Sequence, residues 1–398
     1  MKKIGFALFV TWGIIACGQS GQPPQVQPTP PPPSNHTGPS LYVSPSGLDS
    51  NPGTQEQPFK TIAYADKVAS AGATIHVAPG TYFGGFTTMK SGTATAPVTF
   101  TSDTKWGAKI IPPQAGGSSM GWHSTGDYVI INGFDISGLI TSPGVDWRFA
   151  LYAEGNGTQI INNRLHDILT DAAAAHAANA SGNGGAIVEI QLGANGNNPA
   201  YTGTISNNLV YNIGFDASNN REGGIYFGSP GVIANNIVYG IAGGVAITPE
   251  KLSSHVNCVN NTIFHSRFGI YLSNDTPGEQ VTTNWNVNNN IIYDTVYALT
   301  ETTGSGVAGH NIFSNNNISL ASQATYRLSV GASNFNPVNG DPQFVNYVAT
   351  GGGDYHLKPN SVDINSGTSV GAPTTDFDGT PRPQGGAFDV GAYERVSP

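Results

Sequence analysis

Positive charge is scarce in the central part of the chain, and three arginines share one position there. Residues 110–357 contain one lysine, Lys251, and five arginines. Arg148, Arg221 and Arg267 each come just before a short strand-like segment. A guanidinium group binds a carboxylate or a sulfate through two parallel hydrogen bonds. If the segments stack as successive layers of one sheet, these side chains predict a line of anion-binding groups along one side of the molecule.

A tyrosine follows each of these arginines within the strand-like segment. The three rings are Tyr152, Tyr226 and Tyr271. An aromatic ring offers a flat apolar surface to a pyranose ring, while the arginine binds its acidic group. We therefore predict an acidic polysaccharide as the partner, with the substrate-binding residues Arg148, Tyr152, Glu189, Arg267 and Tyr271.

The elements that must position these side chains are organised by a repeat of asparagine pairs. The second members are Asn163, Asn208, Asn236, Asn261 and Asn290, separated by 45, 28, 25 and 29 residues. Repeats of this length, with alternating apolar residues between them, predict a solenoid of about 8–10 coils. Asparagine tolerates the left-handed backbone of a sharp turn, and stacked amides can bond along the solenoid axis. The pairs are therefore predicted to be structural.

This organisation resembles the right-handed parallel β-helix proteins of the pectate-lyase-like superfamily. Residues 41–82 resemble the opening of many secreted β-helix proteins and some polysaccharide lyases, and residues 341–394 resemble a recurring ending. The resemblance implies an all-β fold, a single-stranded right-handed parallel β-helix over residues 41–396. A short N-terminal capping helix within 60–70 would cover the open end of the solenoid. The superfamily includes lyases, hydrolases, esterases, epimerases and non-catalytic proteins, so the resemblance does not choose an activity.

Three functions remain open. A polysaccharide lyase acting by β-elimination needs a cation to neutralise the uronate and a base to remove a proton. The catalytic residues predicted for it are Arg221, Lys251, Tyr226, His176 and Glu222. Of the cations Arg221 and Lys251, one would neutralise the uronate and the other would hold a neighbouring subsite, and the base would be His176, Tyr226 or Lys251. A glycoside hydrolase or transglycosylase would use Glu189, Glu222 or Glu250. The third function is a non-catalytic cell-surface protein that binds glycan.

No cofactor is assigned from the sequence. Calcium is an open alternative, but the aspartates of the coils are scattered and form no ligand cluster. The segment around Asp376 and Asp378 lacks the remaining ligand positions of a calcium loop. We predict that Asp376, Asp378 and Arg382 form a local turn network.

The N-terminal segment predicts export and a lipid anchor. Lys2 and Lys3 precede an apolar run that ends at Cys17, so residues 1–16 resemble a lipoprotein signal peptide. Residues 17–40 form a Pro-rich tether behind the lipidated cysteine. We expect membrane attachment through Cys17, at the cell surface or the outer membrane, and otherwise secretion. The one remaining cysteine, Cys258, is predicted to be a buried, inert thiol.

Composition agrees with a solenoid and excludes one class of partner. Among 398 residues there are 52 glycines, and charged residues are only 10%. Exposed helices usually carry far more charge than this, so an ordinary helical protein is disfavoured. The formal net charge of −9 disfavours binding of nucleic acid through a basic face. We expect a monomer.

Overall fold

The computed structural model describes most of the chain beyond the predicted signal peptide and tether. Several predicted residues fall outside the described part: Cys17, His176, Arg221, Glu250 and Lys251. The described residues are 38–113, 118–139, 147–170, 184–190, 201–214, 222–241, 243–249, 253–274, 283–303, 311–321, 323–326 and 334–396. No helix within these ranges is long and apolar enough to cross a membrane.

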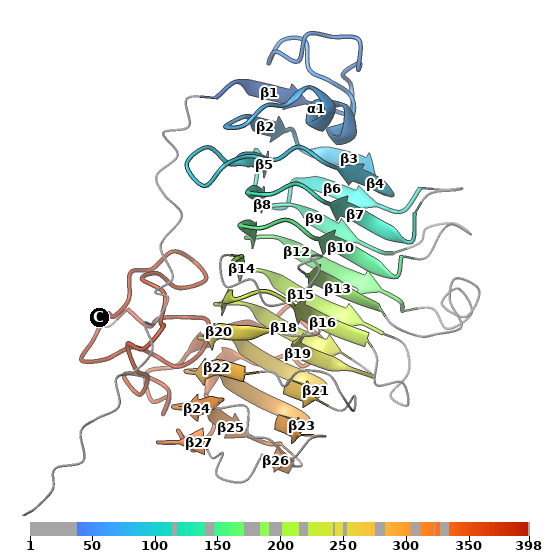
Figure 1. The fold of residues 1–398 in the computed structure, drawn as a ribbon. Coiled ribbons are helices and arrows are strands. Elements are labelled where there is room, and N and C mark those ends of the chain that lie inside the picture. Colours follow the sequence, from blue (N-terminus) through green and yellow to red (C-terminus); the bar gives the residue numbers. More distant parts are fainter. Residues whose placement is uncertain are drawn as a thin grey trace, which may run out of the picture.

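One long parallel sheet forms the first wall of a solenoid (Figure 1). Eleven strands of the described chain follow one another in sequence order along it. Each coil contributes one strand to this sheet, so the number of described coils is one more than the upper end of the predicted range of about 8–10. The strands are β1 (Ser40–Val43), β2 (Thr74–Val77), β5 (Val98–Ser102), β8 (Val129–Asn132), β11 (Thr158–Ile161), β14 (Gly203–Ser206), β17 (Gly231–Ala234), β20 (Ser254–Val259), β22 (Thr283–Asn288), β24 (Ile312–Ser314) and β27 (Asn334–Phe335).

A second parallel sheet supplies two further faces, which the long strands β21 (Thr262–Asn274) and β23 (Ile291–Thr303) join. We call one of these two faces of the second sheet the asparagine-side face. Its strands are β3 (Gly80–Phe83), β6 (Ala108–Ile111), β9 (Asp135–Ser137), β12 (Arg164–Ile168), β15 (Leu209–Ile213), β18 (Ile237–Ile241) and β25 (Asn317–Ser319). The other, which we call the tyrosine face, contains β4 (Phe86–Thr88), β7 (Met120–Ser124), β10 (Phe149–Ala153), β13 (Gly184–Glu189), β16 (Glu222–Phe227), β19 (Val245–Pro249) and β26 (Gln323–Tyr326).

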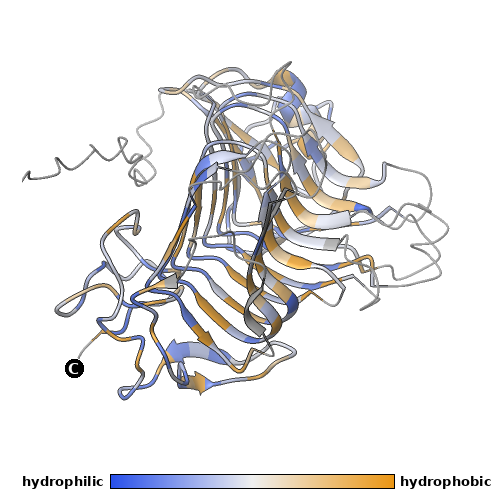
Figure 2. Cartoon of the chain, turned by 60° about the horizontal axis from the view of Figure 1, so that its bottom comes forward, coloured by the Kyte–Doolittle hydropathy of each residue, from blue (hydrophilic) through white to orange (hydrophobic). Residues whose placement is uncertain are grey.

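Ladders of equivalent apolar residues fill the interior. On the first wall Ile160, Ile205, Ile233 and Cys258 occupy one register, and none of them is exposed. Stacking β-branched side chains at one position in every coil suits the pleated surface of a strand. Figure 2 shows the resulting alternation of apolar and hydrophilic bands along the coils. Burial raises the pKa of the Cys258 thiol, so the prediction of a buried cysteine is confirmed.

The second asparagine of each pair forms a buried ladder inside the solenoid. Asn261 Nδ2 donates to Ile233 O at 3.0 Å and to Asn290 Oδ1 at 2.9 Å. Its Oδ1 accepts the backbone and side-chain N–H groups of Asn236 at 2.9 and 3.0 Å. The same pattern links Asn208 to Asn236. The predicted structural role of the pairs is therefore confirmed.

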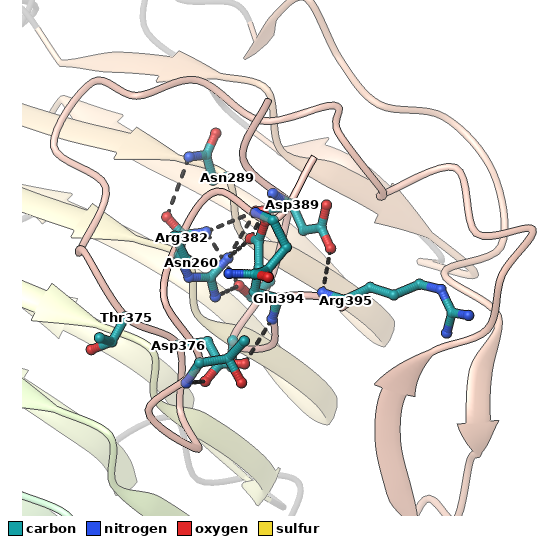
Figure 3. A network of polar contacts seen from close by, with 12 residues as sticks. Asn260, Asn289, Thr375, Asp376, Arg382, Asp389, Glu394 and Arg395 are labelled. Carbon is teal, nitrogen blue, oxygen red and sulfur yellow. Dashed lines mark hydrogen bonds and ion pairs between the residues drawn. The ribbon is translucent and has the colours of Figure 1, made fainter. Parts of the chain in front are cut away.

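The first asparagine of four of the pairs faces outward and binds the C-terminal segment, residues 341–396 (Figure 3). These are Asn207, Asn235, Asn260 and Asn289. These asparagines have left-handed backbone, with φ of 55° at both Asn235 and Asn260. Asn235 Nδ2 donates to Thr375 O at 2.7 Å, and Asn260 Nδ2 donates to Asp389 O at 2.9 Å. The C-terminal segment thus lies along the side of the solenoid, shown in red in Figure 1.

The predicted turn network is correct for Asp376 and wrong for Arg382. Asp376 accepts the backbone N–H groups of Asp378 and Thr380 at 2.9 and 2.7 Å. Arg382 is instead buried and forms an ion pair of 2.8 Å with Glu394. Its Nη2 also reaches Asn235 Oδ1 at 3.3 Å, so it contributes to the docking of the segment.

The predicted capping helix is confirmed as α1 (Ile62–Val68). It begins at Thr61, whose side chain accepts the Tyr64 backbone N–H at 3.2 Å, as an N-cap residue does. Its buried Asp66 accepts the backbone N–H groups of Met89 and Lys90, which follow β4. The helix is therefore bonded to the tyrosine face at the N-terminal end of the solenoid (Figure 1).

Candidate functional site

The three predicted tyrosines occupy one register on the tyrosine face. Tyr152 in β10 pairs with Val188 in β13, which pairs with Tyr226 in β16. Tyr226 pairs with Thr248 in β19, whose Oγ1 donates to Tyr271 O in β21 at 2.9 Å. All three tyrosines are half-buried, while their neighbours in sequence point into the core. We call the series Tyr152, Val188, Tyr226, Thr248, Tyr271 and Thr300 the tyrosine row.

Two of the predicted arginines stand at equivalent positions beside this row. The Arg148 guanidinium lies 4.9 Å from the centroid of Phe149, and that of Arg267 lies 5.5 Å from the centroid of Phe268. Each phenylalanine in turn contacts the tyrosine three residues later, with ring centroids 5.3 Å apart. A guanidinium stacked on a ring keeps its edge N–H donors directed away from the ring, where they can bind an anion.

Glu189 does not belong to this surface. Glu189 pairs with Ala153 and Phe227 on the neighbouring strands, and the side chains of both point into the core. Glu189 itself is 1% exposed. Ser229 Oγ donates to its Oε1 at 2.6 Å, and burial raises the pKa of Glu189 to about 7. A sugar cannot reach a side chain inside the solenoid, so the prediction that Glu189 binds substrate is wrong. The hydrolase alternative loses this carboxylate as well. Only the backbone of Glu222 is described, as the first residue of β16.

A cavity of about 780 Å³ lies where the asparagine-side face turns into the tyrosine face. We call it the corner cavity. It is formed by β15, β18, β21 and β23 together with two residues beyond them. Its lining residues are Tyr211, Asn212, Tyr239, Gly240, Ile241, His265, Ser266, Arg267, Asp294, Thr295, Val296, Leu320 and Thr350. Arg267 therefore lines this cavity and also contacts the aromatic residues of the tyrosine face.

A histidine and an aspartate on the rim of the cavity form an oriented pair. His265 Nδ1 lies 3.1 Å from Asp294 Oδ2. Tyr347, from the C-terminal segment, donates its hydroxyl to the same carboxylate oxygen at 2.8 Å. An ionised carboxylate only accepts hydrogen bonds, so the proton of this contact belongs to His265 Nδ1. This tautomer leaves Nε2 with a lone pair.

Left-handed backbone places His265 and Asp294 at the same corner. Their φ values are 47° and 50°, and Asn212 and Gly240 have 56° and 66° at the equivalent positions of preceding coils. The sequence shows this feature, because each of these residues lies four positions after the second asparagine of its pair. Asp, Asn, Gly and His are the types that most readily adopt this conformation. His265 is not among the site residues predicted from the sequence, because its partner Asp294 lies 29 residues away in the chain.

A second histidine cluster adjoins the cavity. His166 Nε2 lies 2.8 Å from Asp135 Oδ1, and its Nδ1 lies 2.6 Å from Asp167 Oδ2. Arg164 forms two hydrogen bonds to Asp135, at 3.0 and 2.6 Å. The His166 ring stacks on Tyr211, which lines the cavity, with centroids 4.8 Å apart. Within the described ranges no group of three or more His, Cys, Asp or Glu side chains is arranged to hold a metal ion.

Replacing His166 with glutamine is expected to destabilise the fold most in mildly acidic solution. Burial opposes the charged imidazole, but the hydrogen bonds and charges of Asp135 and Asp167 outweigh burial and raise the pKa of His166. The same contacts lower the pKa of both aspartates despite their burial. The stabilisation of the fold by the charged His166 is therefore lost as pH rises through the raised pKa of the histidine. The stabilisation by the two charged aspartates is lost as pH falls through their lowered pKa values.

Melting curves from pH 3 to pH 9 would measure this difference. The loss for His166→Gln should be largest between the ordinary pKa values of aspartate and histidine, about 4 and 6.5, and should reach about 1–3 kcal/mol there. His76→Gln, which removes a more exposed histidine paired with Asp103, is the matched control. An equal loss at every pH for His166→Gln would contradict a charged cluster.

Comparison with known proteins identifies the architecture. A family model described as a right handed beta helix region matches residues 149–318, and one described as a protein of unknown function, DUF1565, matches residues 45–85. With the parallel sheets described above, the predicted right-handed parallel β-helix is confirmed. The uncharacterised protein YwoF of Bacillus subtilis is 47% identical over 64 residues, which are 16% of this chain and only 14% of that protein.

Two solved structures are similar in shape at low identity. The pectate lyase Pel9A shares 17% identity at a TM-score of 0.45, over 91% of this chain and 98% of that chain. A rhamnogalacturonan lyase shares 17% identity at a TM-score of 0.48, over 77% of this chain and 91% of that chain. Values this low do not assign an activity to the chain.

Proposed function

We propose that this right-handed parallel β-helix is a carbohydrate-active protein that cleaves an acidic polysaccharide by β-elimination in the corner cavity. One observation carries the proposal: a carboxylate-oriented imidazole and a guanidinium lie on the rim of the same cavity. These are the base and the cation that such a reaction needs. The aromatic residues next to Arg267 would hold the sugar chain on either side of the bond that breaks.

His265 is the proposed base. Its hydrogen bond to Asp294 holds the ring in the tautomer with a free Nε2 lone pair. Asp294 also stabilises the imidazolium that forms when Nε2 takes up a proton, as the aspartate of a catalytic triad does. The Tyr347 hydroxyl keeps the carboxylate in place.

Arg267 is the proposed neutraliser. Its guanidinium can bind the uronate carboxylate through two parallel hydrogen bonds. Removal of the neighbouring proton moves negative charge onto that carboxylate, so the contact strengthens in the transition state and lowers the barrier. The predicted roles of Arg221 and Lys251 as cations, and of His176, Tyr226 and Glu222, remain predictions.

The reaction balances without an added oxidant or reductant. His265 Nε2 takes the proton from the carbon that bears the carboxylate, and the electron pair of that bond forms a carbon–carbon double bond. The bond from the adjacent carbon to the glycosidic oxygen breaks. The departing oxygen takes a proton from water or from the imidazolium. The products are an unsaturated uronide and a new reducing end.

The test is a digest of purified protein with a panel of acidic and neutral polysaccharides. The panel contains pectate, alginate, hyaluronan, chondroitin and the neutral polymer xylan. We expect ultraviolet absorbance of an unsaturated uronide with at least one acidic polymer and none with xylan. New reducing ends without this absorbance would favour a hydrolase, and tight binding without any product would favour a non-catalytic glycan-binding protein. Either result would overturn the proposed reaction.

A further inference from the structure

We infer that the polysaccharide lies along the solenoid axis over the tyrosine row and carries its acidic group on every second sugar. The inference relies on the proposed function for the ligand being an acidic polysaccharide. It adds the direction of the chain and the spacing of its charges, which separate an alternating disaccharide polymer from a polymer of uronate alone.

Aromatic and small residues alternate along the tyrosine row. Tyr152, Tyr226 and Tyr271 lie on β10, β16 and β21, and the strands between them, β13 and β19, carry Val188 and Thr248 instead. The next strand, β23, continues the alternation with Thr300 opposite Tyr271. The two residues between the tyrosines are buried, at 3% and 6% exposure, whereas the tyrosines are half-buried. From Tyr152 to Thr300 the row therefore offers a sugar-sized platform on every second coil, while on the N-terminal side His123 pairs with Tyr152 and adds a ring on the adjacent coil.

The spacing of the platforms follows from the stacking of the strands. Neighbouring parallel strands lie about 4.8 Å apart, so tyrosines on alternate coils lie about 9.6 Å apart. This distance is comparable to two sugars of an extended polysaccharide. A polymer with a two-sugar repeat would therefore place the same sugar on each tyrosine.

The two predicted arginines of the described chain, Arg148 and Arg267, share one register but recur at twice the interval of the tyrosines. Phe149, which follows Arg148, aligns through Gly185, Gly223 and Val245 with Phe268, which follows Arg267. The two arginines thus stand four coils apart, which is two periods of the tyrosine row. Positive charges two periods apart complement acidic groups on alternate sugars, and the sugars between would meet Val188 or Thr248. On the coil of Tyr226 the residue in the register of the arginines is Glu222, which precedes Gly223 as Arg148 precedes Phe149.

Glycine residues fix the middle platform. A Cβ atom on Gly223 would lie 2.2 Å from the Tyr226 ring, and one on Gly185 would lie 3.1 Å from it. The Tyr226 ring therefore lies against bare backbone, where Tyr152 and Tyr271 have a phenylalanine. A side chain at residue 223 would force this ring out of the row.

The first experiment compares polymers that differ in charge spacing. Hyaluronan and desulfated chondroitin carry a carboxylate on every second sugar, whereas pectate and alginate carry one on every sugar. Affinity for the catalytically unaltered protein is measured by calorimetry and cleavage by uronide absorbance. We expect affinity and kcat/KM to be about tenfold higher for the alternating polymers. A preference for pectate or alginate would overturn the inference while leaving the proposed lyase reaction intact.

The second experiment uses Tyr152→Ala, because Tyr152 lies four coils from Arg267 and the proposed point of cleavage. For long alternating chains we expect KM to rise about tenfold, the order expected for the loss of one stacked ring, with kcat unchanged. Tetrasaccharides, which are too short to reach Tyr152, should show no change. The matched control is Tyr42→Ala on the first wall, where Tyr42 stacks on His76.

The outcomes of the two experiments separate the inference from the proposed function. An equal effect of Tyr152→Ala on long and short chains, or no effect on either, would show that the chain does not lie along the row. If no polymer is cleaved, the proposed reaction fails, and the affinities for alternating and uniform polymers still decide the inference. Gly223→Ala should weaken the binding of long alternating chains in the same way as Tyr152→Ala.

Discussion

Replacing His265 with asparagine should abolish nearly all lyase activity, with kcat about 10²–10⁴-fold lower and the melting temperature unchanged. The loss follows because Nε2 of the imidazole is the only proton acceptor assigned to the reaction. Asparagine suits the position because it tolerates the left-handed backbone, with φ of 47°. The equivalent residue of a preceding coil is already an asparagine, Asn212. The measurement is steady-state turnover on the polymer that yields the unsaturated uronide.

Two further variants control this prediction. His255→Asn removes an exposed histidine of the first wall, where φ is 57°, and should keep full activity and stability. Asp294→Asn should lower kcat by a similar order to His265→Asn, because an amide group no longer selects the tautomer with a free Nε2. Full activity of His265→Asn would remove the proposed base and with it this mechanism.

Replacing Asn261 with alanine should destabilise the fold by about 3–5 kcal/mol, a loss at the upper end for a single substitution. The side chain is fully buried and makes four hydrogen bonds to neighbouring coils. Alanine would leave the backbone N–H of Asn236 without its acceptor. It would also remove one of the two acceptors of the Asn236 side-chain amide and one donor to the carbonyl of Ile233. A buried polar group without a partner costs about 1–3 kcal/mol.

Urea unfolding followed by circular dichroism would measure this loss. The matched control is Asn339→Ala, at an exposed asparagine that bonds only to the carbonyl of Pro337. It should change the free energy of unfolding by less than about 0.5 kcal/mol. A similarly small effect of Asn261→Ala would show that the inner asparagine ladder contributes little to stability.

The architecture could be predicted from the sequence because its signals are local. An asparagine pair marks one turn, and the turn needs the same left-handed residue in every coil. The spacing of the pairs therefore gave the approximate length of a coil, and the alternation of apolar residues marked which segments were strands. The capping helix and the buried Cys258 were likewise predictable from the few residues around them.

The corner cavity could not be predicted in the same way, because its residues come from different coils. His265 and Asp294 on its rim are 29 residues apart, and in the adjoining cluster Asp135 and His166 are 31 apart. Each pair exists only because the coils stack in one register. Tyr347 reaches the site from still farther along the chain, after the C-terminal segment has docked on the outer asparagines.

The sequence by itself determined the repeat, the strands, the asparagine turns and the shared position of three arginines and three tyrosines relative to the strands. The tertiary structure decided which side of each strand faces the core. Glu189 and Tyr226 lie one register position apart on neighbouring strands, yet one is buried inside the solenoid and the other lies on its outer face. Successive side chains of a strand point to opposite sides, so a shift of one residue exchanges core and surface. Only the pairing of whole coils fixes that register.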